Sequence, residues 1–269
     1  MRCEQWVKFI PGLSPAGYAV ALRKELKLVG RIDPFEIAKE IDVPVFNEDL
    51  DEIDGCLLKK AENKRILINK NIQHLNRQRF TLAHELGHLQ IKSHDEKMYR
   101  CSASDIQRYR GVKLIENEAN DFASELLLPE ADVQSIVRKR RLSMDLVKDI
   151  SEDYGISLTA TALKIIKVCP DRGAVVLSEN GQIKWSFESK TFGYEVRKTK
   201  LHEYTYAYDY FNEGSLPDSP QKVLAYAWLG NARDRNQTLL EESIAIYSLG
   251  MVLTLIYTED LEESEDDEE

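Results

Sequence analysis

The sequence predicts an α+β protein, with a mainly helical first domain that contains a small sheet and a smaller β-rich second domain. Three observations support this prediction. Apolar residues recur with helical spacing up to about residue 170. Short β-rich runs interrupt that pattern between residues 43 and 69. After Pro170, alternating strands with tight turns replace the helices. We therefore expect domains at residues 1–170 and 171–257, followed by an acidic tail at 258–269.

Capping and helix-breaking residues indicate where the helices of the first domain begin and end. Asp33 is a suitable N-cap because Pro34 follows at the first helical position. Pro129 stops a strongly amphipathic helix, and Gly155 separates the last two. The expected helices are 14–29, 34–41, 76–91, 116–128, 131–140, 143–154 and a stretch after residue 155, and the expected strands are 43–46 and 65–69.

The second domain is expected to consist of two strand pairs. Asn180-Gly181 is the strongest short hairpin signal, and it joins strands at 174–178 and 182–188. In the second of these strands, apolar and polar residues alternate, which predicts one buried and one solvated face. A second pair, 243–247 and 251–257, is expected across Leu249-Gly250.

The net charge of −10 is concentrated at the C-terminus. Residues 259–269 read EDLEESEDDEE, with nine acidic residues and no basic one, so the remaining chain carries a net charge of only about −1. Such a run is typical of a solvated, disordered segment, and a docking or autoinhibitory tail is the alternative. With 43% hydrophobic residues, the remaining chain has ample material for a core.

Several observations favour a cytoplasmic protein. The longest apolar run, at 251–257, has the length of a strand and not the ~20 residues of a membrane span. Residues 1–15 lack the apolar core of a signal peptide. The cysteines are scattered without a CxxC pair, which indicates free thiols in a reducing compartment and not a cysteine zinc site. They are Cys3, Cys56, Cys101 and Cys169.

The stretch RFTLAHELGH, at 79–88, places two histidines and a glutamate on one expected helix. Positions i and i+4 share a face, so His84 and His88 can present their imidazoles to one metal ion. Zn²⁺ accepts such nitrogens at ~2.0–2.1 Å, and Glu85 can take a proton from a water that the metal activates. Gly87 costs a helix about 1 kcal/mol against alanine, which predicts that another backbone packs closely there. A helix with two incidental histidines is the alternative.

A catalytic zinc site of this kind needs a third protein ligand, and the expected helix at 116–128 offers two glutamates. At ~100° per residue, Glu116 falls on the edge of the apolar stripe, whereas Glu118 falls on the polar side. Asn120, one turn after Glu116, also points inward and can orient a ligand histidine. The helical phase therefore favours Glu116 over Glu118.

Two motifs resemble the ImmA/IrrE family of zinc metallopeptidases: RQRFTLAHELGH at 77–88 and ENEANDFASELLLP at 116–129. The likeness extends from about residue 34 to about residue 168 and is weaker in the C-terminal region. Members often carry a further histidine just after the first motif. In this chain that position is displaced, so His94 is given no role.

The resemblance implies a zincin-like peptidase domain with one catalytic Zn²⁺. It assigns His84, His88 and Glu116 as metal ligands, Glu85 as the general base and Asn120 as a partner of a ligand. It also implies an endopeptidase that cleaves a helix-turn-helix repressor and so derepresses phage, mobile-element or stress-response genes. Two other functions stay open: a regulatory binding module with a structural or vestigial metal site, and a toxin–antitoxin component.

Weaker signals concern substrate and nucleic acid. The strand RILIN, at 65–69, could hold a peptide if its edge is exposed, and an ordinary internal strand is the alternative. Residues 144–168 have the cadence of a helix-turn-helix, but few lysines or arginines, which argues against DNA binding and favours contact with a protein. The basic run at 138–141 is typical of a solvated helix end. Candidate oxyanion donors, by residue type alone, are Tyr99, Tyr109, Tyr154, His202 and Tyr204.

Overall fold

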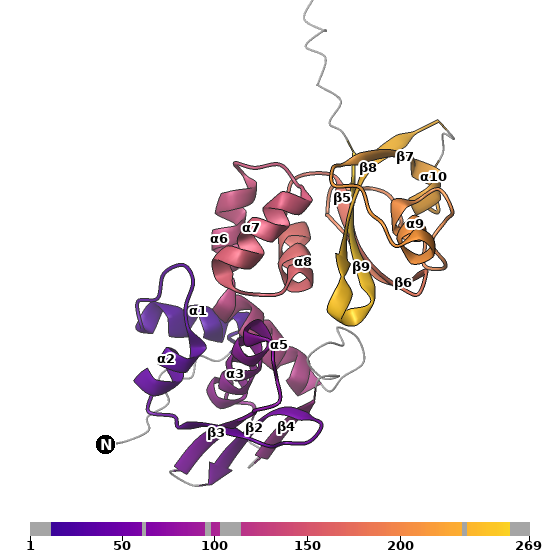
Figure 1. Ribbon diagram of the computed structural model, residues 1–269. Helices are drawn as coiled ribbons and strands as arrows, with labels where there is room; N and C mark the ends of the chain where they lie inside the picture. The colour runs from indigo at the N-terminus through magenta and orange to yellow at the C-terminus, as the bar shows by residue number, and fades with distance from the viewer. Residues whose placement is uncertain (1–11, 61–62, 95–97, 103–113, 233–235, 259–269) are drawn as a thin grey trace, which may run out of the picture. The chain divides into compact units, whose positions relative to one another are not determined.

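A computed structural model describes residues 12–60, 63–94, 98–102, 114–232 and 236–258, and it confirms the α+β prediction (Figure 1). The chain packs as two compact units. Unit 1 comprises Met1–Asp132 and Ser151–Ser157, and unit 2 comprises Val133–Ile150 and Leu158–Glu269. The division expected near residue 170 follows a different criterion, the change from helices to strands, and stays a prediction. Most of the expected acidic tail lies outside the described residues.

Unit 1 combines a four-stranded sheet with helices. The sheet order is β1-β3-β2-β4, with β1 parallel to β3 and the other pairs antiparallel. The strands are β1 (Val45–Glu48), β2 (Ile53–Lys60), β3 (Asn63–Asn69) and β4 (Met98–Ser102), and the helices include α1 (Pro15–Glu25), α2 (Pro34–Glu40), α3 (Leu75–Gln90) and α5 (Leu114–Leu127). Neither β2 nor β4 is predicted from the sequence, because β2 contains Asp, Gly and Lys, which have weak strand preference, and β4 is only five residues long.

Helix α3 is the central element of unit 1. It packs on β2 and β3 of the sheet and against α5 (Figure 1). Its early residue Arg79 is buried and donates hydrogen bonds to the carbonyl oxygens of Ile32, Tyr154 and Gly155. These bonds satisfy a buried charge and fix the first half of the helix, so the residues that follow along α3 have defined positions.

The predicted start of α2 is confirmed. The Asp33 carboxylate accepts a hydrogen bond from the Phe35 amide at 3.0 Å, and Pro34 opens the helix. Helix α1 ends at Glu25, earlier than the predicted residue 29, because Lys27 has a φ of 54° that no α-helix accommodates.

Unit 2 contains an antiparallel five-stranded sheet of order β6-β5-β9-β8-β7. Its strands are β5 (Gly173–Glu179), β6 (Gln182–Glu188), β7 (Gln221–Leu224), β8 (Thr238–Ile246) and β9 (Met251–Tyr257), and its helices include α8 (Leu158–Val168), α9 (Tyr206–Glu213) and α10 (Ala225–Trp228). Two further helices, α6 (Glu130–Val137) and α7 (Met144–Tyr154), have residues in both units.

Both predicted strand pairs of unit 2 are present. Asn180 and Gly181 have φ values of 51° and 72°, so the β5–β6 turn has both central residues left-handed, as a two-residue hairpin requires. β8 pairs with β9 as expected, although it begins at Thr238, well before the predicted residue 243.

In the described part of unit 2, Glu241 is a buried acid in the core. Glu241 is 2% exposed, and its carboxylate accepts hydrogen bonds from the Trp228 indole and from the Ala207 amide, both at 2.8 Å. The Ser243 hydroxyl donates a third at 3.2 Å. The acid therefore links β8 to the first residues of α9 and to α10.

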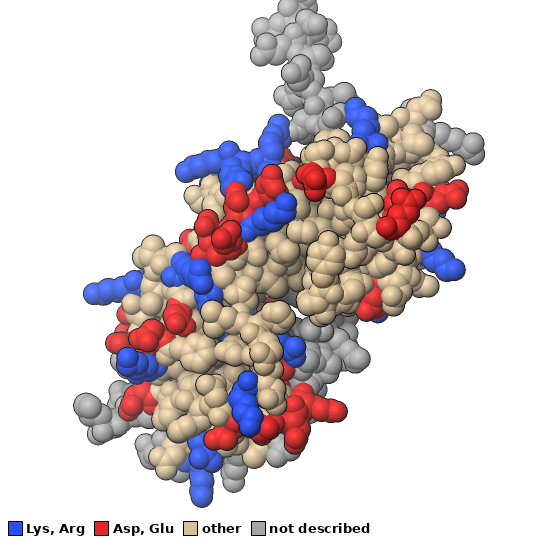
Figure 2. All heavy atoms as spheres, viewed as in Figure 1, with Lys and Arg blue, Asp and Glu red and all other residues tan. Residues whose placement is uncertain are grey.

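The basic side chains that could contact DNA are partly engaged within unit 2, and the expectation against DNA binding stays a prediction. Lys164, in the second helix of the helix-turn-helix-like stretch, is only 8% exposed. In the basic run, Arg140 pairs with Asp149 and Arg141 with Asp171. Figure 2 shows basic and acidic side chains interspersed on the face in view. Within the described residues, no helix is long and apolar enough to cross a membrane.

Candidate metal centre

The site is built on the second half of α3. His84, Glu85 and His88 are all fully buried there, one helical turn or less apart. The predicted close approach at Gly87 is confirmed: a Cβ at this position would lie 3.2 Å from the backbone of Ala119 and 3.1 Å from the Phe122 ring. The missing side chain lets α5 approach α3 closely, and α5 carries Glu116 to the two histidines.

Three predicted side chains converge on one point. The Nε2 atoms of His84 and His88 lie 3.0 Å apart. One oxygen of Glu116, Oε2, lies 3.1 Å from His84 Nε2 and 3.4 Å from His88 Nε2. The second candidate, Glu118, does not join this group, because its carboxylate turns to His94 instead.

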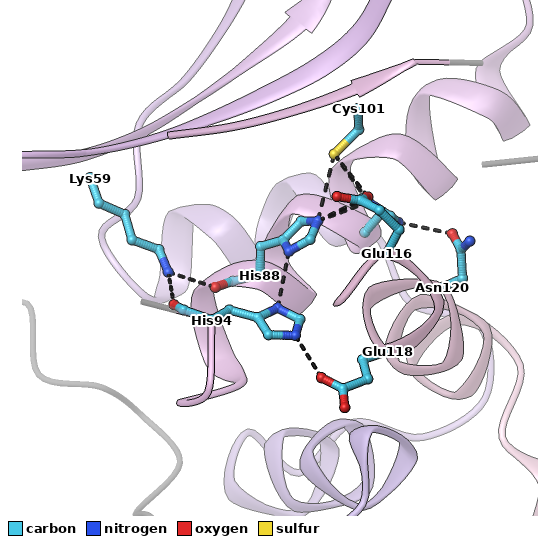
Figure 3. Close-up of polar contacts among 8 residues, drawn as sticks. Lys59, His88, His94, Cys101, Glu116, Glu118 and Asn120 are labelled. Carbon is cyan, nitrogen blue, oxygen red and sulfur yellow. Dashed lines mark hydrogen bonds and ion pairs between the residues drawn. The ribbon is translucent and has the colours of Figure 1, made fainter. Parts of the chain in front are cut away.

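A fourth side chain that sequence reasoning excluded also reaches this point. The Sγ atom of Cys101, on β4, lies 3.2 Å from His84 Nε2, 3.6 Å from His88 Nε2 and 3.5 Å from Glu116 Oε2 (Figure 3). The potential ligand atoms of these four buried residues all lie within 4.8 Å of one another. The spacing of residues in the sequence does not predict this position, because Cys101 is placed there by the pairing of β4 with β2.

Outer hydrogen bonds orient both histidines. His84 Nδ1 lies 2.9 Å from Asn120 Oδ1, as predicted for a supporting partner. His88 Nδ1 lies 3.0 Å from His94 Nδ1, and His94 Nε2 lies 2.8 Å from a Glu118 oxygen (Figure 3). His94, to which the sequence assigned no role, is thus buried between a candidate ligand and an acid.

These bonds determine where the ring protons lie. Glu118 can only accept, so His94 carries its proton on Nε2 and offers a lone pair at Nδ1. Neutral His88 then donates from Nδ1, and neutral His84 donates from Nδ1 to Asn120. Both Nε2 lone pairs therefore point at the Glu116 carboxylate and at each other. Such a convergence of lone pairs is favourable only around a cation.

The electrostatics of the site also favour a cation. Burial by itself raises the pKa of the Glu116 carboxyl, but the adjacent His84 and His88 rings outweigh it in the metal-free chain and hold that pKa well below its usual range. Burial disfavours a charged His84 ring, yet the adjacent Glu116 carboxylate raises the pKa of His84. His88 shows the opposite balance, because burial lowers its pKa to about 4. The Glu116 carboxylate is therefore ionised, and a cation beside it would be stabilised.

Glu85 is in a different state from Glu116. It is fully buried, and neither of its carboxylate oxygens has a hydrogen bond of normal geometry, although the Cys101 thiol and the Leu57 amide face it. Burial raises its pKa to about 7. A Cβ added to Gly55 would lie 2.9 Å from Glu85 Oε1, so the glycine in β2 makes room for this carboxylate. A base with a pKa near neutrality can both take and return a proton.

The ligand atoms fit a transition metal of zinc's size. Two imidazole nitrogens and a carboxylate oxygen are donors that Zn²⁺ accepts, and tetrahedral ligands at ~2.0–2.1 Å lie about 3.3 Å from one another. The observed separations of 3.0, 3.1 and 3.4 Å agree with that value. His84, His88 and Glu116 could therefore hold one such ion without a large rearrangement.

Two of the candidate oxyanion donors, Tyr99 and Tyr154, lie in the described part of unit 1. Tyr99 is buried and stacks on the His88 ring, with centroids 4.2 Å apart. The Tyr154 hydroxyl donates to Asp132 at 2.9 Å. His202 and Tyr204 belong to unit 2, and Tyr109 lies outside the described residues. The structure therefore identifies no donor among them.

Of the two alternatives for the strand RILIN, an exposed edge and an internal strand, the structure shows the internal strand. This segment forms β3, which lies between β1 and β2 in the sheet and pairs with both. Its backbone groups are used within the sheet and cannot bind a peptide as an added strand. In the described part of unit 1, the outer strands are β1 and β4, and β4 carries Cys101.

Comparison with known proteins agrees with the motifs. The family model for the IrrE N-terminal-like domain matches residues 38–165. Immunity region protein 2 of Bacillus phage phi105 is 34% identical over 113 residues, which are 41% of this chain and 67% of that protein. Metallopeptidase ImmA of Bacillus subtilis is 32% identical over 109 residues, which are 39% of this chain and 59% of that protein.

One solved structure supports the fold alone. A transcriptional regulator of Mycobacterium tuberculosis superimposes with a TM-score of 0.55 at 12% identity, covering 93% of this chain and 77% of that one.

Proposed function

Because the chain belongs to the ImmA/IrrE family of metallopeptidases, we propose that it is a zinc-dependent endopeptidase. His84, His88 and Glu116 would hold the ion through two nitrogens and one oxygen. This donor set suits zinc better than magnesium or calcium, which prefer oxygen ligands only. Zinc bound there would supply Lewis-acid polarisation of a peptide carbonyl and an activated water.

Glu85 is the observation that carries the proposal. A site that only holds a metal has no need of a fully buried carboxylate without normal hydrogen bonds beside its ligands. With a pKa near 7, Glu85 can accept a proton from the attacking water and return it to the leaving amine. Asn120 and His94 would hold the ligand rings in the orientation this requires.

The substrate we propose is a helix-turn-helix repressor, cut in the cytoplasm where it binds DNA. The resemblance of the two motifs to the ImmA/IrrE family supports this, as does a relative named for a phage immunity region. Cleavage would then derepress phage, mobile-element or stress-response genes.

One observation favours a binding module with a structural metal site as the second candidate. Structural zinc sites have four protein ligands, whereas catalytic sites leave one position open. Cys101 brings a fourth potential ligand atom to this cluster.

The deciding experiment combines metal analysis with a cleavage assay. The purified chain is expected to contain about one zinc, as three-ligand sites of this type do. His84→Ala and His88→Ala are expected to empty the site. The exposed His74, the N-cap residue of the same helix, provides the control His74→Ala. The wild type is then incubated with the helix-turn-helix protein encoded by a neighbouring gene, and fragments are identified by mass spectrometry. Full zinc in both histidine variants would refute the site, and a repressor that stays intact with both the wild type and Cys101→Ala would refute the substrate.

A further inference from the structure

The Cys101 sulfur lies beside all three proposed metal ligands. It is 3.2 to 3.6 Å from all three proposed ligand atoms and is shielded from solvent. Strand register explains the placement: Cys101 pairs with Gly55 of β2, and Gly55 lies directly against Thr81 and Glu85 of α3. Without a side chain at Gly55, strand β2 lies close to α3, and the paired β4 brings the thiol over the histidines.

The separations match a complete tetrahedron. For a zinc ion with nitrogen or oxygen at ~2.0–2.1 Å and sulfur at ~2.3 Å, the sulfur lies about 3.6 Å from each of the other ligands. The observed sulfur distances are 3.2, 3.6 and 3.5 Å. A thiol that merely fills space would have no reason to lie at similar distances from two lone-pair nitrogens and a carboxylate oxygen. Its single proton can satisfy only one of them.

We propose that Cys101 is a fourth protein ligand of the metal and that the resting chain is a latent peptidase. The inference rests on the proposed function. A thiolate at the fourth position occupies the place that water and the substrate carbonyl need, so cleavage requires its displacement. The unsatisfied Glu85 carboxylate beside the sulfur is an independent sign that a polar group other than this thiol belongs there.

The fold allows such a displacement. Within the described residues β4 pairs with β2 on one side only, because it is the last strand of the sheet order. Moving an outer strand breaks the backbone hydrogen bonds to one neighbouring strand, whereas moving β2 or β3 would break those to two. A peptide that displaced β4 would therefore leave α3 and α5, which carry the three remaining ligands, in place.

X-ray absorption of the zinc-loaded wild type tests the coordination directly and needs no variant. We expect one sulfur scatterer at about 2.3 Å beside nitrogen and oxygen scatterers at about 2.0–2.1 Å. Substitution of the metal with Co²⁺ gives a second measurement, since a thiolate ligand produces a sulfur-to-cobalt charge-transfer band in the near ultraviolet. Cys101→Ala is expected to lose both signals but keep the metal, and Cys169→Ala, at a buried cysteine of unit 2, is expected to keep both.

The same variants test latency. Cys101→Ala is expected to cleave the helix-turn-helix protein several-fold faster than the wild type and than Cys169→Ala. Zinc held by nitrogen and oxygen alone in the wild type would overturn the proposed ligand while leaving the peptidase intact. A sulfur ligand without faster cleavage by Cys101→Ala would overturn latency. A wild type that binds no zinc would overturn the proposed function itself.

Discussion

The Nδ1 atoms of His88 and His94 lie 3.0 Å apart, and the far nitrogen of His94 lies 2.8 Å from Glu118. Lys59 reinforces the pair by donating hydrogen bonds to the carbonyl oxygens of both histidines, at 2.7 and 2.6 Å. The hydrogen bonds that run from Glu118 through His94 to His88 fix the tautomer of His88 in which Nε2 offers its lone pair to a metal. Glu118, on the more polar side of α5, thus contributes to the centre through His94.

The first prediction ranks three side chains by their place in the chain of contacts around the proposed metal site. Glu116→Ala removes a proposed ligand and is expected to cause the largest loss of zinc affinity. His94→Ala removes an outer partner, for which a loss of about 10- to 100-fold is usual. Glu118→Ala is expected to act in the same direction but less, since water can replace its carboxylate, which is 26% exposed. Chelator titration of bound zinc measures all three.

Asp121→Ala, at an exposed acid of α5, is the matched control and is expected to behave like the wild type. If Glu118→Ala matches this control, the hydrogen bond to His94 contributes nothing to metal binding. If Glu118→Ala releases zinc while Glu116→Ala retains it, the assignment of the third ligand is wrong.

The sequence predicts the local part of this site and misses the part made by strand pairing. His84, Glu85 and His88 are one helical segment, so their shared face follows from geometry alone, and the phase of α5 selects Glu116 over Glu118. Cys101 could not be predicted, because its position depends on the pairing of β2 and β4. Strand β2 contains glycine and charged residues, and β4 has only five residues, so both give weak strand signals. His94 lies four residues beyond α3, where no periodicity applies.

The second prediction separates chemistry from metal binding. Glu85→Gln keeps the shape of the side chain and removes the base, so zinc content is expected to stay unchanged. Cleavage of the helix-turn-helix protein is expected to fall by a factor on the order of 10² or more. Rates are compared at equal zinc occupancy. Cleavage by Glu85→Gln at the wild-type rate would show that another group takes the proton.

The third prediction concerns the stability of the chelator-treated protein. Burial raises the Glu85 pKa from 4.5 to about 7 in the folded chain. Below pH 4.5 the Glu85 carboxyl is protonated in both the folded and the unfolded state, so its ionisation does not change the free energy of unfolding. As the pH rises, the unfolded state ionises first, so the folded state loses stability until the pH passes the folded pKa. A shift of this size corresponds to roughly 3 kcal/mol at most.

The comparison is between metal-free wild type and Glu85→Gln, whose amide does not titrate. Urea unfolding at about pH 5 and about pH 8 gives the two free energies of unfolding. We expect the variant to gain stability relative to the wild type at the higher pH. If the free energies of unfolding of the variant and the wild type differ by the same amount at both pH values, Glu85 is ionised at both of them.

The fourth prediction concerns the core of unit 2. Glu241→Ala leaves the Trp228 indole N–H and the Ala207 amide buried without an acceptor. Each such group costs about 1–3 kcal/mol, so the free energy of unfolding is expected to fall by several kcal/mol. Glu241→Gln keeps one acceptor oxygen and is expected to lose less. Equal losses in the two variants would show that volume, and not hydrogen bonding, is what the acid provides.

The last prediction tests the contact that brings α5 to α3. Gly87→Ala gains about 1 kcal/mol of helix propensity, but the new methyl group would lie 3.2 Å from the Ala119 backbone. Overpacking against backbone typically costs about 1–3 kcal/mol, so we expect a net loss of stability. Because α5 must move outward, Glu116 moves away from the histidines, and zinc affinity is expected to fall as well. Gly230→Ala, where nothing lies closer than 3.9 Å, is the control. A stabilised Gly87→Ala with unchanged zinc affinity would mean that the two helices yield without disturbing the ligands.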